Sequence, residues 1–329
     1  CVLQDAKLTN NSDLNLGGFF PLSTRIEQTS ESWALFGEAG YAITDSLEVG
    51  LGLRYYEDER EVQPGGTAEV RDESFDSTNP KIYLSYHAAE SIHLYANAAK
   101  GFRSGGFNVF QPAGTPNFDP ENVWSYELGA KMSLLDERLN TELALFYSDY
   151  GDYQTSSLVG GTNLTTNAGD AEIQGVELSL TYLATEKLEL GFTGNYMDTE
   201  FTEINSTSYI EGDPLDMVPQ YGFSAWSQYS FQWFDSSPGF ARIDYSQQGK
   251  SNYRNRSFDD LVNGLAYHST SDVIDMLNAR VSWESQEWSL EVYGLNLLNE
   301  NGFVGPFSIE NISARPRPRT VGLNLEYSF

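Results

Sequence analysis

The most diagnostic stretch of the chain is its end, PRPRTVGLNLEYSF, which spans Pro316–Phe329. From Val321 onward every second residue is apolar, and the residues between them are small or polar. A period of two describes a β-strand with one apolar face. A final strand that ends on an exposed aromatic is typical of outer-membrane β-barrels, whose strands face lipid on one side and the lumen on the other. We therefore expect Tyr327 and Phe329 to lie at the periplasmic interface and to act as a barrel-assembly signal.

The composition is compatible with such a barrel. The 329 residues are 14% aromatic, yet the mean hydropathy is only −0.41, as an alternation of apolar and polar residues produces. The length suffices for two ordinary domains or one large one. No apolar run approaches the roughly 18 residues of a membrane helix, so a chain of this kind crosses a membrane only as a barrel.

The charge excludes one class of partner. The chain has 47 acidic and 19 basic residues and a net charge of −28, which argues against nucleic acid because phosphate binding needs clustered lysines and arginines. The acids concentrate between Glu57 and Asp76, where we expect a solvated loop in preference to a cation-binding surface. The single cysteine, Cys1, permits neither an internal disulfide nor a cysteine–histidine metal site.

Segments of period two recur along the whole chain. Each is about as long as a tilted membrane strand, roughly 9–11 residues, and aromatics tend to lie near the ends of its apolar face, as interfacial girdles require. The opposite faces carry Glu, Lys, Arg, Asn and His, which suit a water-filled lumen. The clearest apolar faces lie in Leu47–Tyr55, Ile82–Tyr86, Ile92–Ala98, Trp124–Leu134, Val176–Tyr182, Leu188–Tyr196, Tyr221–Phe231, Leu277–Trp283 and Trp288–Val292.

The connections between these segments alternate between short and long. Bacterial outer-membrane barrels have short periplasmic turns and long extracellular loops, so the sequence predicts an all-β, antiparallel transmembrane β-barrel. The short connections are Ala42–Ser46, Ala88–Ser91, Asp136–Arg138, Ala184–Glu186, Asp235–Pro238 and Ser285–Glu287. The long ones are Asp58–Ser74, Arg103–Glu121, Gly151–Gly169, Phe201–Val218, Lys250–Asp272 and Asn299–Arg315.

The strand count is about thirteen or fourteen, after an irregular start at residues 1–30. The first clear strand, Trp33–Tyr41, and the last strand both run toward short turns, which would close a barrel with a parallel seam. Bacterial single-chain barrels avoid such a seam by having an even number of strands. We therefore expect further strands before residue 1.

Five sequence elements, in order along the chain, together resemble one family. They are KGFRSGGFN at Lys100–Asn108, PENVWSYELG at Pro120–Gly129, NAGDAEIQGVE at Asn167–Glu177, NLLN at Asn296–Asn299 and RPRT at Arg317–Thr320. These elements resemble those of TonB-dependent outer-membrane receptors of the siderophore-receptor type. The resemblance implies a barrel of about 22 strands that a plug domain fills. Residues 1–329 would then be the C-terminal portion of the barrel, without the plug and the first strands.

The same resemblance implies a function and a set of partners. Members of this family take up scarce ligands, most often a ferric siderophore or another iron complex, across the bacterial outer membrane. The implied partners are outer-membrane lipid, the barrel-assembly machinery, and an inner-membrane energy-coupling complex that acts through the missing N-terminal part.

Candidate ligand contacts are the aromatic and basic residues of the long connections. Residues 251–256 form the one basic cluster on an acidic surface, and such a cluster would attract an anionic ferric chelate. For any single residue, a role in loop structure or in contacts with lipid headgroups is the favoured alternative. The candidates are Phe107, Phe110, Tyr253, Arg254, Arg256, Phe303 and Phe307.

Arg103 stands where a strand passes into a long loop. We expect it to anchor that loop through a carboxylate such as Glu121 or Glu127, and the adjacent Gly105-Gly106 to supply turn chemistry. His87 and His93 fall on lumenal faces across one hairpin, and His268 lies far away in the sequence. Two lumenal histidines without a third ligand predict hydrogen bonding in preference to a metal site.

No catalytic signature is present, because the chain has no GxSxG, HExxH, P-loop or dinucleotide-binding element. The sequence therefore predicts no enzyme, no catalytic residue and no cofactor. Two alternatives to a receptor remain open. One is a self-contained passive channel of about fourteen strands for small or apolar solutes, if residues 1–10 form a strand. The other is a soluble all-β binding module, which would fold without detergent, whereas the apolar faces predict aggregation.

Overall fold

The computed structural model describes residues 2–15, 23–63, 70–109, 115–159, 162–206, 208–233, 237–253, 267–268, 270–305, 308–309 and 314–328. Within these ranges only the backbone is described for residues 2–15, 23–25, 157–159, 162–163, 267–268 and 308–309. In this part of the chain no helix is long and apolar enough to cross a membrane.

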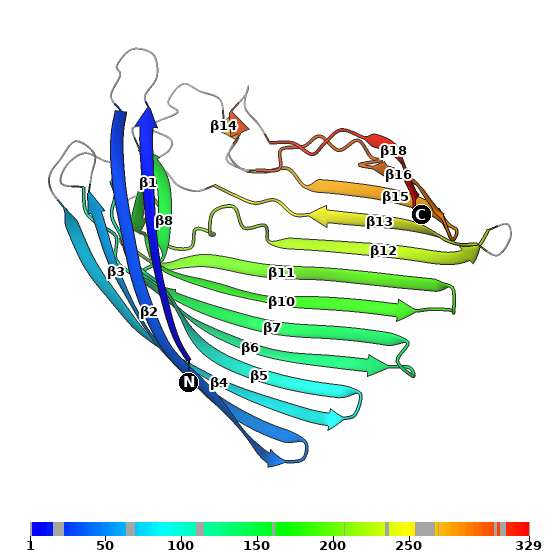
Figure 1. The fold of residues 1–329 in the computed structure, drawn as a ribbon, viewed down its shortest axis with the longest axis horizontal. Coiled ribbons are helices and arrows are strands. Elements are labelled where there is room, and N and C mark those ends of the chain that lie inside the picture. The colour runs from blue at the N-terminus through cyan, green and yellow to red at the C-terminus, as the bar shows by residue number, and fades with distance from the viewer. Residues whose placement is uncertain are drawn as a thin grey trace.

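The described residues form one antiparallel sheet of 14 strands and two small two-stranded sheets (Figure 1). Every strand of the large sheet pairs with the strands next to it in sequence, apart from the inserted small ones. The predicted all-β antiparallel fold is therefore confirmed. The large sheet contains β1 (Val2–Asn15), β2 (Ser23–Thr44), β3 (Leu47–Gln63), β4 (Arg71–Ala89), β5 (Ile92–Arg103), β6 (Glu121–Leu134), β7 (Leu139–Gly151), β10 (Gly169–Leu183), β11 (Leu188–Ile204), β12 (Tyr221–Gln232), β13 (Pro238–Gln248), β15 (Ile274–Glu284), β16 (Trp288–Leu295) and β18 (Thr320–Tyr327). The small sheets pair β8 (Gln154–Val159) with β9 (Thr162–Asn167), and β14 (Tyr267–His268) with β17 (Ser308–Ile309).

Short turns and long connections lie at opposite ends of the strands, as the sequence predicts. Several strands are longer than expected, and the largest difference concerns the acidic stretch Glu57–Asp76. This stretch is mostly paired strand, because β3 runs to Gln63 and β4 begins at Arg71. Acids on both faces hide the period of two there, so the sequence suggests a loop where backbone pairing continues.

The start of the chain also differs from the expectation. Residues that looked irregular form β1 and the first half of β2, which pair along their whole length from Val2 to Phe36. With β1 included, the first strand runs toward the long connections and the last toward the short turns. The parity argument for missing strands was therefore wrong.

The sheet curves into an open trough whose edges are β1 and β18 (Figure 1). Among the described residues no backbone pairing joins these two edges. The observed arrangement is therefore an open barrel wall, which gives no support to a self-contained channel of fourteen strands.

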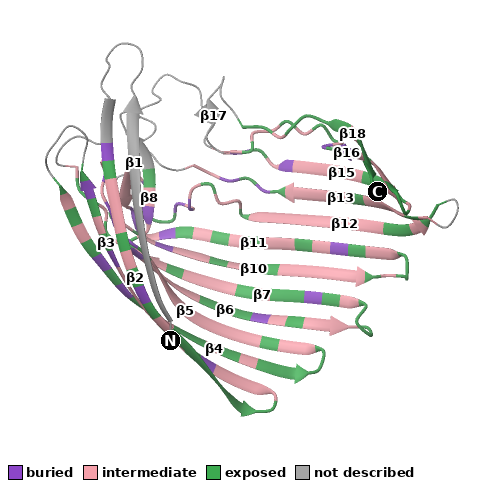
Figure 2. Cartoon of the chain, viewed as in Figure 1, coloured by how far each residue is buried: buried purple, intermediate pink, exposed green. Residues whose placement is uncertain are grey.

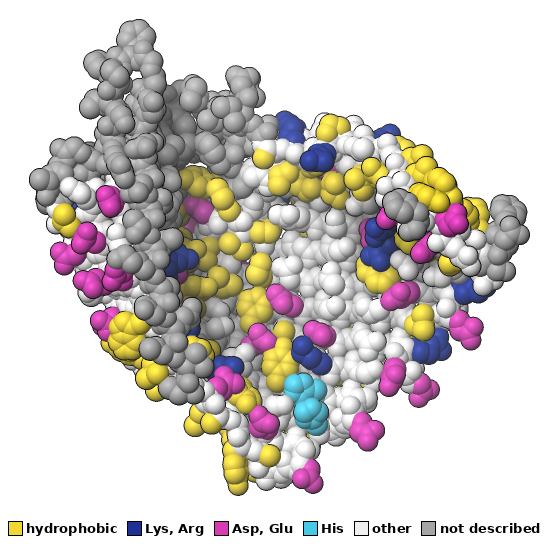
Figure 3. All heavy atoms as spheres, viewed as in Figure 1, with side chains coloured by type: hydrophobic (Ala, Val, Ile, Leu, Met, Phe, Trp, Pro, Cys, Tyr) yellow, Lys and Arg dark blue, Asp and Glu magenta, His cyan; other side chains and the backbone are white. Residues whose placement is uncertain are grey.

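The two faces of the wall differ as a membrane strand requires. Outward positions are apolar and open, with Leu51 62% and Val321 70% exposed, which suits contact with lipid (Figure 2). The hollowed concave face is mainly polar, with scattered charges and the described histidines (Figure 3). His87 and His93 stack there with ring centroids 4.7 Å apart, and His93 Nε2 lies 2.8 Å from Ser85 Oγ. Within the described residues no group of three or more potential ligands gathers around them to hold a metal.

The wall is stiffened by glycines that lie beneath aromatic rings of the neighbouring strand. Gly50 stands directly opposite Tyr83, and a Cβ on Gly50 would lie 2.0 Å from the Tyr83 ring. Gly129 stands opposite Tyr95 in the same way, with 2.3 Å to its ring. The rings therefore lie flat across the inner face, which only glycine opposite them permits.

Burial is concentrated at the long-loop end of the wall (Figure 2). With the exception of Ala34, the buried apolar residues of the described chain lie at strand ends or in connections there. They are Ile26, Val62, Phe75, Ala168, Ala171, Phe201, Tyr209, Leu215 and Ile274. The buried apolar core of the described residues therefore lies where the long connections meet the adjacent strand ends.

Candidate functional site at the long-loop end

The connection between β5 and β6 folds inward across the inner face of β3 and β4. Arg60 Nη1 donates to the Gly105 carbonyl at 2.9 Å. A Cβ on Gly105 would lie 2.5 Å from the Phe118 carbonyl oxygen and 2.6 Å from the Phe75 ring. Neither Gly105 nor Gly106 has a positive φ. The expected turn chemistry was therefore wrong, and the glycine pair instead permits this close approach of backbone and rings.

Asp58 links the inward connection to β2 and β3. It is fully buried, and it accepts hydrogen bonds from Ser30 Oγ at 2.6 Å and from Arg60 Nε at 2.7 Å. Burial alone raises the pKa of a carboxyl group. Here the hydrogen bonds from Ser30, Arg60 and Ser104 outweigh burial and lower the pKa of Asp58. Asp58 is thus an ionised acid that holds β2, β3 and the inward connection together.

Three amide side chains join this connection to the β8–β9 hairpin, and we call Asn108, Gln154 and Asn167 the amide clasp. Asn108 Nδ2 donates to the carbonyls of Pro116 at 2.9 Å and Thr165 at 2.8 Å, and its Oδ1 accepts from Thr165 N at 2.9 Å. The side-chain amide of Asn108 thereby makes the hydrogen bonds to Pro116 and Thr165 that the backbone of a neighbouring strand would otherwise make.

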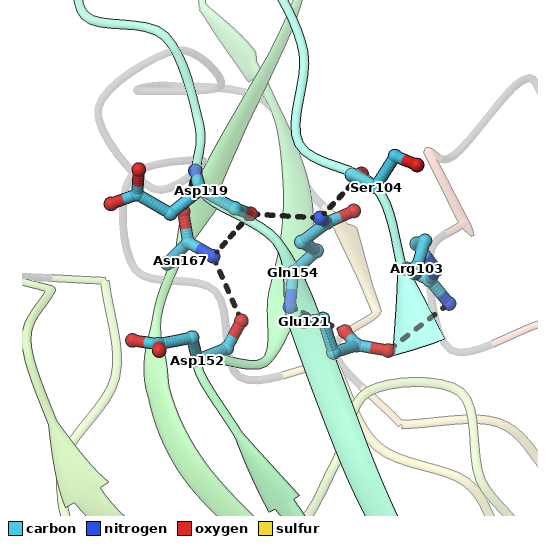
Figure 4. A network of polar contacts seen from close by, with 7 residues as sticks. All are labelled: Arg103, Ser104, Asp119, Glu121, Asp152, Gln154 and Asn167. Atoms are coloured by element: carbon cyan, nitrogen blue, oxygen red, sulfur yellow. Dashed lines mark hydrogen bonds and ion pairs between the residues drawn. The ribbon is translucent and has the colours of Figure 1, made fainter. Parts of the chain in front are cut away.

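Gln154 and Asn167 complete the clasp around Asp119 (Figure 4). Gln154 Nε2 donates to the carbonyls of Ser104 at 3.0 Å and Asp119 at 2.9 Å. Asn167 Nδ2 donates to the Asp119 carbonyl at 2.9 Å, and its Oδ1 accepts from Asp119 N at 2.8 Å. A further bond of 2.8 Å from Asn167 Nδ2 reaches the Asp152 carbonyl. Both long connections are thus fixed to each other by side-chain-to-backbone bonds.

Glu121 lies at the start of β6, next to the clasp, and is 4% exposed. Its Oε2 accepts from Gln154 N at 2.6 Å, and its Oε1 lies 3.5 Å from Arg103 Nη2 (Figure 4). Burial raises the pKa of Glu121, although Gln154 and Arg103 act in the opposite direction. The structure thus pairs Arg103 with Glu121, whereas Glu127, the other carboxylate considered, hydrogen-bonds Tyr95. That the Arg103–Glu121 pair anchors the loop stays a prediction.

A small aromatic core supports the hairpin from the side of β10 and β11. Phe201 packs on Tyr209 with ring centroids 4.6 Å apart and meets Tyr153 edge-on at 5.7 Å. Tyr209 Oη donates to Asp216 Oδ2 at 2.8 Å, and burial together with that carboxylate raises the pKa of Tyr209. Gly169 has a φ of 133° and a Cβ there would lie 1.9 Å from the Glu203 carbonyl oxygen, so this position requires glycine.

A second clasp closes the connection between β16 and β18. Asn296 is 1% exposed, and its Nδ2 donates to the carbonyls of Glu300 at 2.9 Å and Arg317 at 2.7 Å. Its Oδ1 accepts from Glu300 N at 2.7 Å. Asn299 Oδ1 accepts from Arg319 N at 3.2 Å. The NLLN and RPRT elements, which are separate in sequence, therefore bind each other.

A cavity of about 390 Å³ lies between β2, β3 and the inward connection. The candidate residue Phe107 lines it, together with Phe118, which was not among the candidates from the sequence. The remaining lining residues are Gln28, Thr29, Ser30, Arg60, Glu61 and Gly106.

The other predicted site residues are dispersed. Phe303 lies on the connection after β16, where the Arg315 guanidinium sits 4.1 Å from its ring centroid and its N–H donates to Asp272 Oδ2 at 2.9 Å. Tyr253 lies after β13, and burial together with Asp216 raises its pKa. Tyr327 packs on Trp288 at the short-turn end, with ring centroids 4.7 Å apart. The candidates Phe110, Arg254, Arg256, Phe307 and Phe329 lie outside the described residues.

A curved antiparallel wall with an apolar outer face, a polar inner face and folded connections at one end is the architecture of a bacterial outer-membrane β-barrel receptor. The family model "TonB dependent receptor-like, beta-barrel" matches residues 4–297. The chain therefore belongs to this family and is part of an outer-membrane barrel.

Relatives with known names are similar over part of their length. The pesticin receptor of Yersinia enterocolitica is 26% identical over 227 residues, which cover 67% of this chain and 33% of that protein. The metal-pseudopaline receptor CntO of Pseudomonas aeruginosa (strain UCBPP-PA14) is 30% identical over 204 residues, or 59% of this chain and 28% of that protein. The chain thus spans about a third of these relatives.

Solved structures show the same fold at low identity. The ferric yersiniabactin uptake receptor FyuA from Yersinia pestis superposes with a TM-score of 0.80 at 21% identity, over 99% of this chain and 50% of that one. The closed form of the ferric-catecholate import receptor Fiu from E. coli K12 gives a TM-score of 0.74 at 18% identity, over 99% of this chain and 51% of that one. The open trough therefore has the fold of about half of a receptor of this kind.

Proposed function

We propose that the protein containing this chain is an energy-coupled outer-membrane receptor that takes up a scarce ligand, with a ferric siderophore or another iron complex as the leading class. The observation that carries the proposal is the family match over residues 4–297. It is supported by relatives whose names describe pesticin and ferric yersiniabactin receptors. In this proposal residues 1–329 are the C-terminal portion of the barrel, and the plug and the first strands come from the rest of the protein.

The partners follow from the same proposal. Outer-membrane lipid surrounds the apolar face, and the barrel-assembly machinery recognises the end of β18 with Tyr327 and Phe329. An inner-membrane energy-coupling complex acts through a part of the protein outside this chain. The receptor catalyses no reaction and holds no cofactor. The ligand contacts the long-loop end, where the described candidates Phe107, Tyr253 and Phe303 lie. Phe110, Arg254, Arg256 and Phe307, which are outside the described residues, are further candidates from the sequence.

The test is uptake of radioactive iron by cells that depend on this receptor. The gene is deleted in the source bacterium, and cells are offered ferric complexes of different chemical classes under iron limitation. We expect the deletion to abolish uptake of at least one complex and the plasmid-borne gene to restore it. Removal of the energy-coupling protein should abolish the same uptake. Uptake that persists without energy coupling would contradict the proposal and favour a passive pore.

One relative favours a second ligand class. The metal-pseudopaline receptor CntO is, by its name, a receptor for a metal complex that is not described as ferric, and it is 30% identical over the matched region. The same cells should therefore also be offered zinc, nickel and cobalt complexes. Loss of uptake confined to one of these metals would replace the iron assignment and keep the receptor assignment.

A further inference from the structure

The cavity beside the inward connection has the form of a small binding site. Its volume of about 390 Å³ is within the range of ligand pockets, about 300–1,000 Å³. Phe107 and Phe118 supply apolar ring surface on the side of the inward connection. The residues of β2, Gln28, Thr29 and Ser30, supply amide and hydroxyl groups on the other side. Apolar walls with a few convergent polar groups are the usual composition of a small-molecule site.

The charge around the cavity does not favour an anion. Arg60 is its one lining cation, and this guanidinium is bound by the buried carboxylate of Asp58 at 2.7 Å and by the Gly105 carbonyl at 2.9 Å. Glu61, which also lines the cavity, is exposed and adds a negative charge. Arg60, Asp58 and Glu61 together therefore carry a net charge of −1. The cavity therefore offers no electrostatic attraction to an anionic chelate. Such a chelate is the ligand that the sequence suggested for the basic cluster at residues 251–256.

The walls of the cavity are held before any ligand binds. Gly106 pairs with Phe118 by two backbone hydrogen bonds of 2.9 and 3.0 Å, and the Phe118 ring lies against Gly106. Asn108, one residue beyond Phe107, is buried and makes three hydrogen bonds of the amide clasp. A preformed site loses little side-chain freedom on binding, which favours even a small ligand group.

We propose that this cavity is a subsite for a non-anionic aromatic group of the transported ligand, held between Phe107 and Phe118 and hydrogen-bonded by Gln28–Ser30. The inference rests on the proposed function only in assigning that group to a transported ligand. The site itself follows from the geometry and the charge of its lining.

The test uses three aromatic probes of matched size and different charge on the complete receptor in detergent. The probes are para-fluorobenzamide, para-fluorobenzoate and para-fluorobenzylammonium, and fluorine NMR line broadening reports binding. A probe of this size should bind the wild type with a Kd in the millimolar range, from about 0.3–0.4 kcal/mol per heavy atom. We expect the amide and the ammonium probe to bind, and the benzoate to bind at least about fivefold more weakly than the amide because of Glu61.

Variants of the lining separate this subsite from general binding. Phe107→Ala should weaken binding of the amide about tenfold or more, as loss of a central aromatic contact does, and Phe107→Tyr should retain it. Phe102→Ala, which removes a ring from the end of β5 outside the cavity, is the matched control. Glu61→Gln alters an exposed side chain without a risk to folding and should bring benzoate binding close to that of the amide.

Two results would overturn the inference. They are amide binding that survives Phe107→Ala, and tighter binding of the benzoate than of the amide by the wild type. Because the probes contain no iron, the outcome is independent of iron uptake. A receptor that transports no iron complex but loses the amide with Phe107→Ala would refute the iron assignment and keep the subsite.

Discussion

The strand wall and the clasped connections are built by opposite means. Away from the long-loop ends of its strands the wall has few buried side chains, and over most strands a period of two in the sequence distinguishes its two faces. Most buried residues lie in the long connections or in the strand ends next to them. The shape of the connections depends on single polar side chains, such as Asn108 and Asn296 in the connections and Asp58 on β3. In the wall, backbone pairing and lipid supply the stability. In the connections, side chains bind backbone groups that have no strand partner.

This difference assigns a role to the sequence elements that identify the family. Asn108, Glu121 and Asn167 each belong to a different element, yet all three meet around the β8–β9 hairpin. Asn296 and Arg317 bring the last two elements together in the same way. Within the described residues the elements therefore serve to hold the connections in place, and the ligand contacts are expected from residues between them, such as Phe107.

The largest expected effect tests the second clasp. Asn296 is buried, makes several hydrogen bonds and has a φ of 49°. Asn296→Ala should lower the free energy of unfolding by about 3 kcal/mol, because buried groups lose their partners and alanine resists a positive φ. Asn296→Gly tolerates that φ, so it should lose about 2 kcal/mol and isolate the hydrogen bonds. Urea unfolding of the complete receptor in lipid vesicles measures both.

The control for this prediction is Asn299→Gly. Asn299 is exposed, has a φ of 56° and makes one long hydrogen bond to Arg319 N. Its replacement should change the stability by less than about 0.5 kcal/mol. Equal losses in the free energy of unfolding at positions 296 and 299 would show that the buried hydrogen bonds of Asn296 contribute no more to stability than the exposed one of Asn299.

The next effect tests the wall. Gly50→Ala places a methyl group in the Tyr83 ring and should lower stability by about 1–3 kcal/mol, as overpacking does. Gly52→Ala is the matched control two residues away, because its nearest contacts would be the flexible end of Glu38 at 3.3 Å and Lys81 Cβ at an ordinary 3.5 Å. Migration of unheated and heated samples in gels reports the folded fraction. Tyr83→Ala in the Gly50→Ala protein should restore folding, and failure to do so would contradict the proposed packing.

A third prediction compares two buried carboxylates in the long-loop parts of their strands, Asp58 on β3 and Glu121 at the start of β6. Asp58→Asn should cost about 1–3 kcal/mol, because asparagine replaces an ionised acceptor that holds Arg60. Glu121→Gln should stay within about 0.5 kcal/mol, since it removes a buried charge whose ion pair with Arg103 is long and exposed. Limited trypsin digestion of intact cells reports the integrity of the connections. A larger effect at Glu121 than at Asp58 would reverse this account.

The pH dependence of the two acids should have opposite signs. The pKa of Asp58 is lowered by folding, so its stabilisation is present above the usual carboxyl pKa of about 3.9 and is lost as the pH falls through the lowered value. The pKa of Glu121 is raised, so acidification from neutral pH protonates it and adds stability. The free energy of unfolding is measured between about pH 3 and pH 7. The loss of stability on acidification that comes from Asp58 should be absent in Asp58→Asn. The gain of stability that comes from Glu121 should be absent in Glu121→Gln.

The smallest effect concerns Arg103. Its side chain is 59% exposed and lies 3.5 Å from Glu121, so Arg103→Ala should cost less than about 1 kcal/mol. The loss should shrink further in high salt, because exposed ion pairs are screened. Trypsin digestion at low and high salt measures it. A loss as large as that of Asn296→Ala would make Arg103 a principal anchor of the loop.

The sequence predicted the wall well because one physical rule, alternation between lipid and water, operates along every strand. It missed β1 because Val2–Asn15 shows no alternation, and it took the acidic ends of β3 and β4 for a loop because charges occupy both faces. The pairing of Arg103 with Glu121 could be predicted from the sequence. Arg103 ends one strand and Glu121 begins the next, so the two residues lie opposite each other.

The rest of the site had no usable signal in the sequence. Gln154 reaches the Ser104 carbonyl 50 residues away, and Arg60 reaches that of Gly105 45 residues away. Hydrogen bonds from side chains to backbone groups far away in the sequence follow no periodic pattern, so the local sequence does not predict them. Phe118 was missed for the same reason, because its position against Gly106 depends on the fold of the whole connection.

Hydrogen exchange of the complete receptor in lipid discs tests the central claim most directly, which is that the clasped connections are as firmly folded as the wall. We predict that the amides of Gly106, Gln154 and Thr165 exchange as slowly as those in the middle of β6 and β7. Asn108→Ala should release the amides of Gly106 and Thr165 while the wall stays protected. Fast exchange at these three amides in the wild type would show that the connections are ordinary mobile loops and would contradict the account.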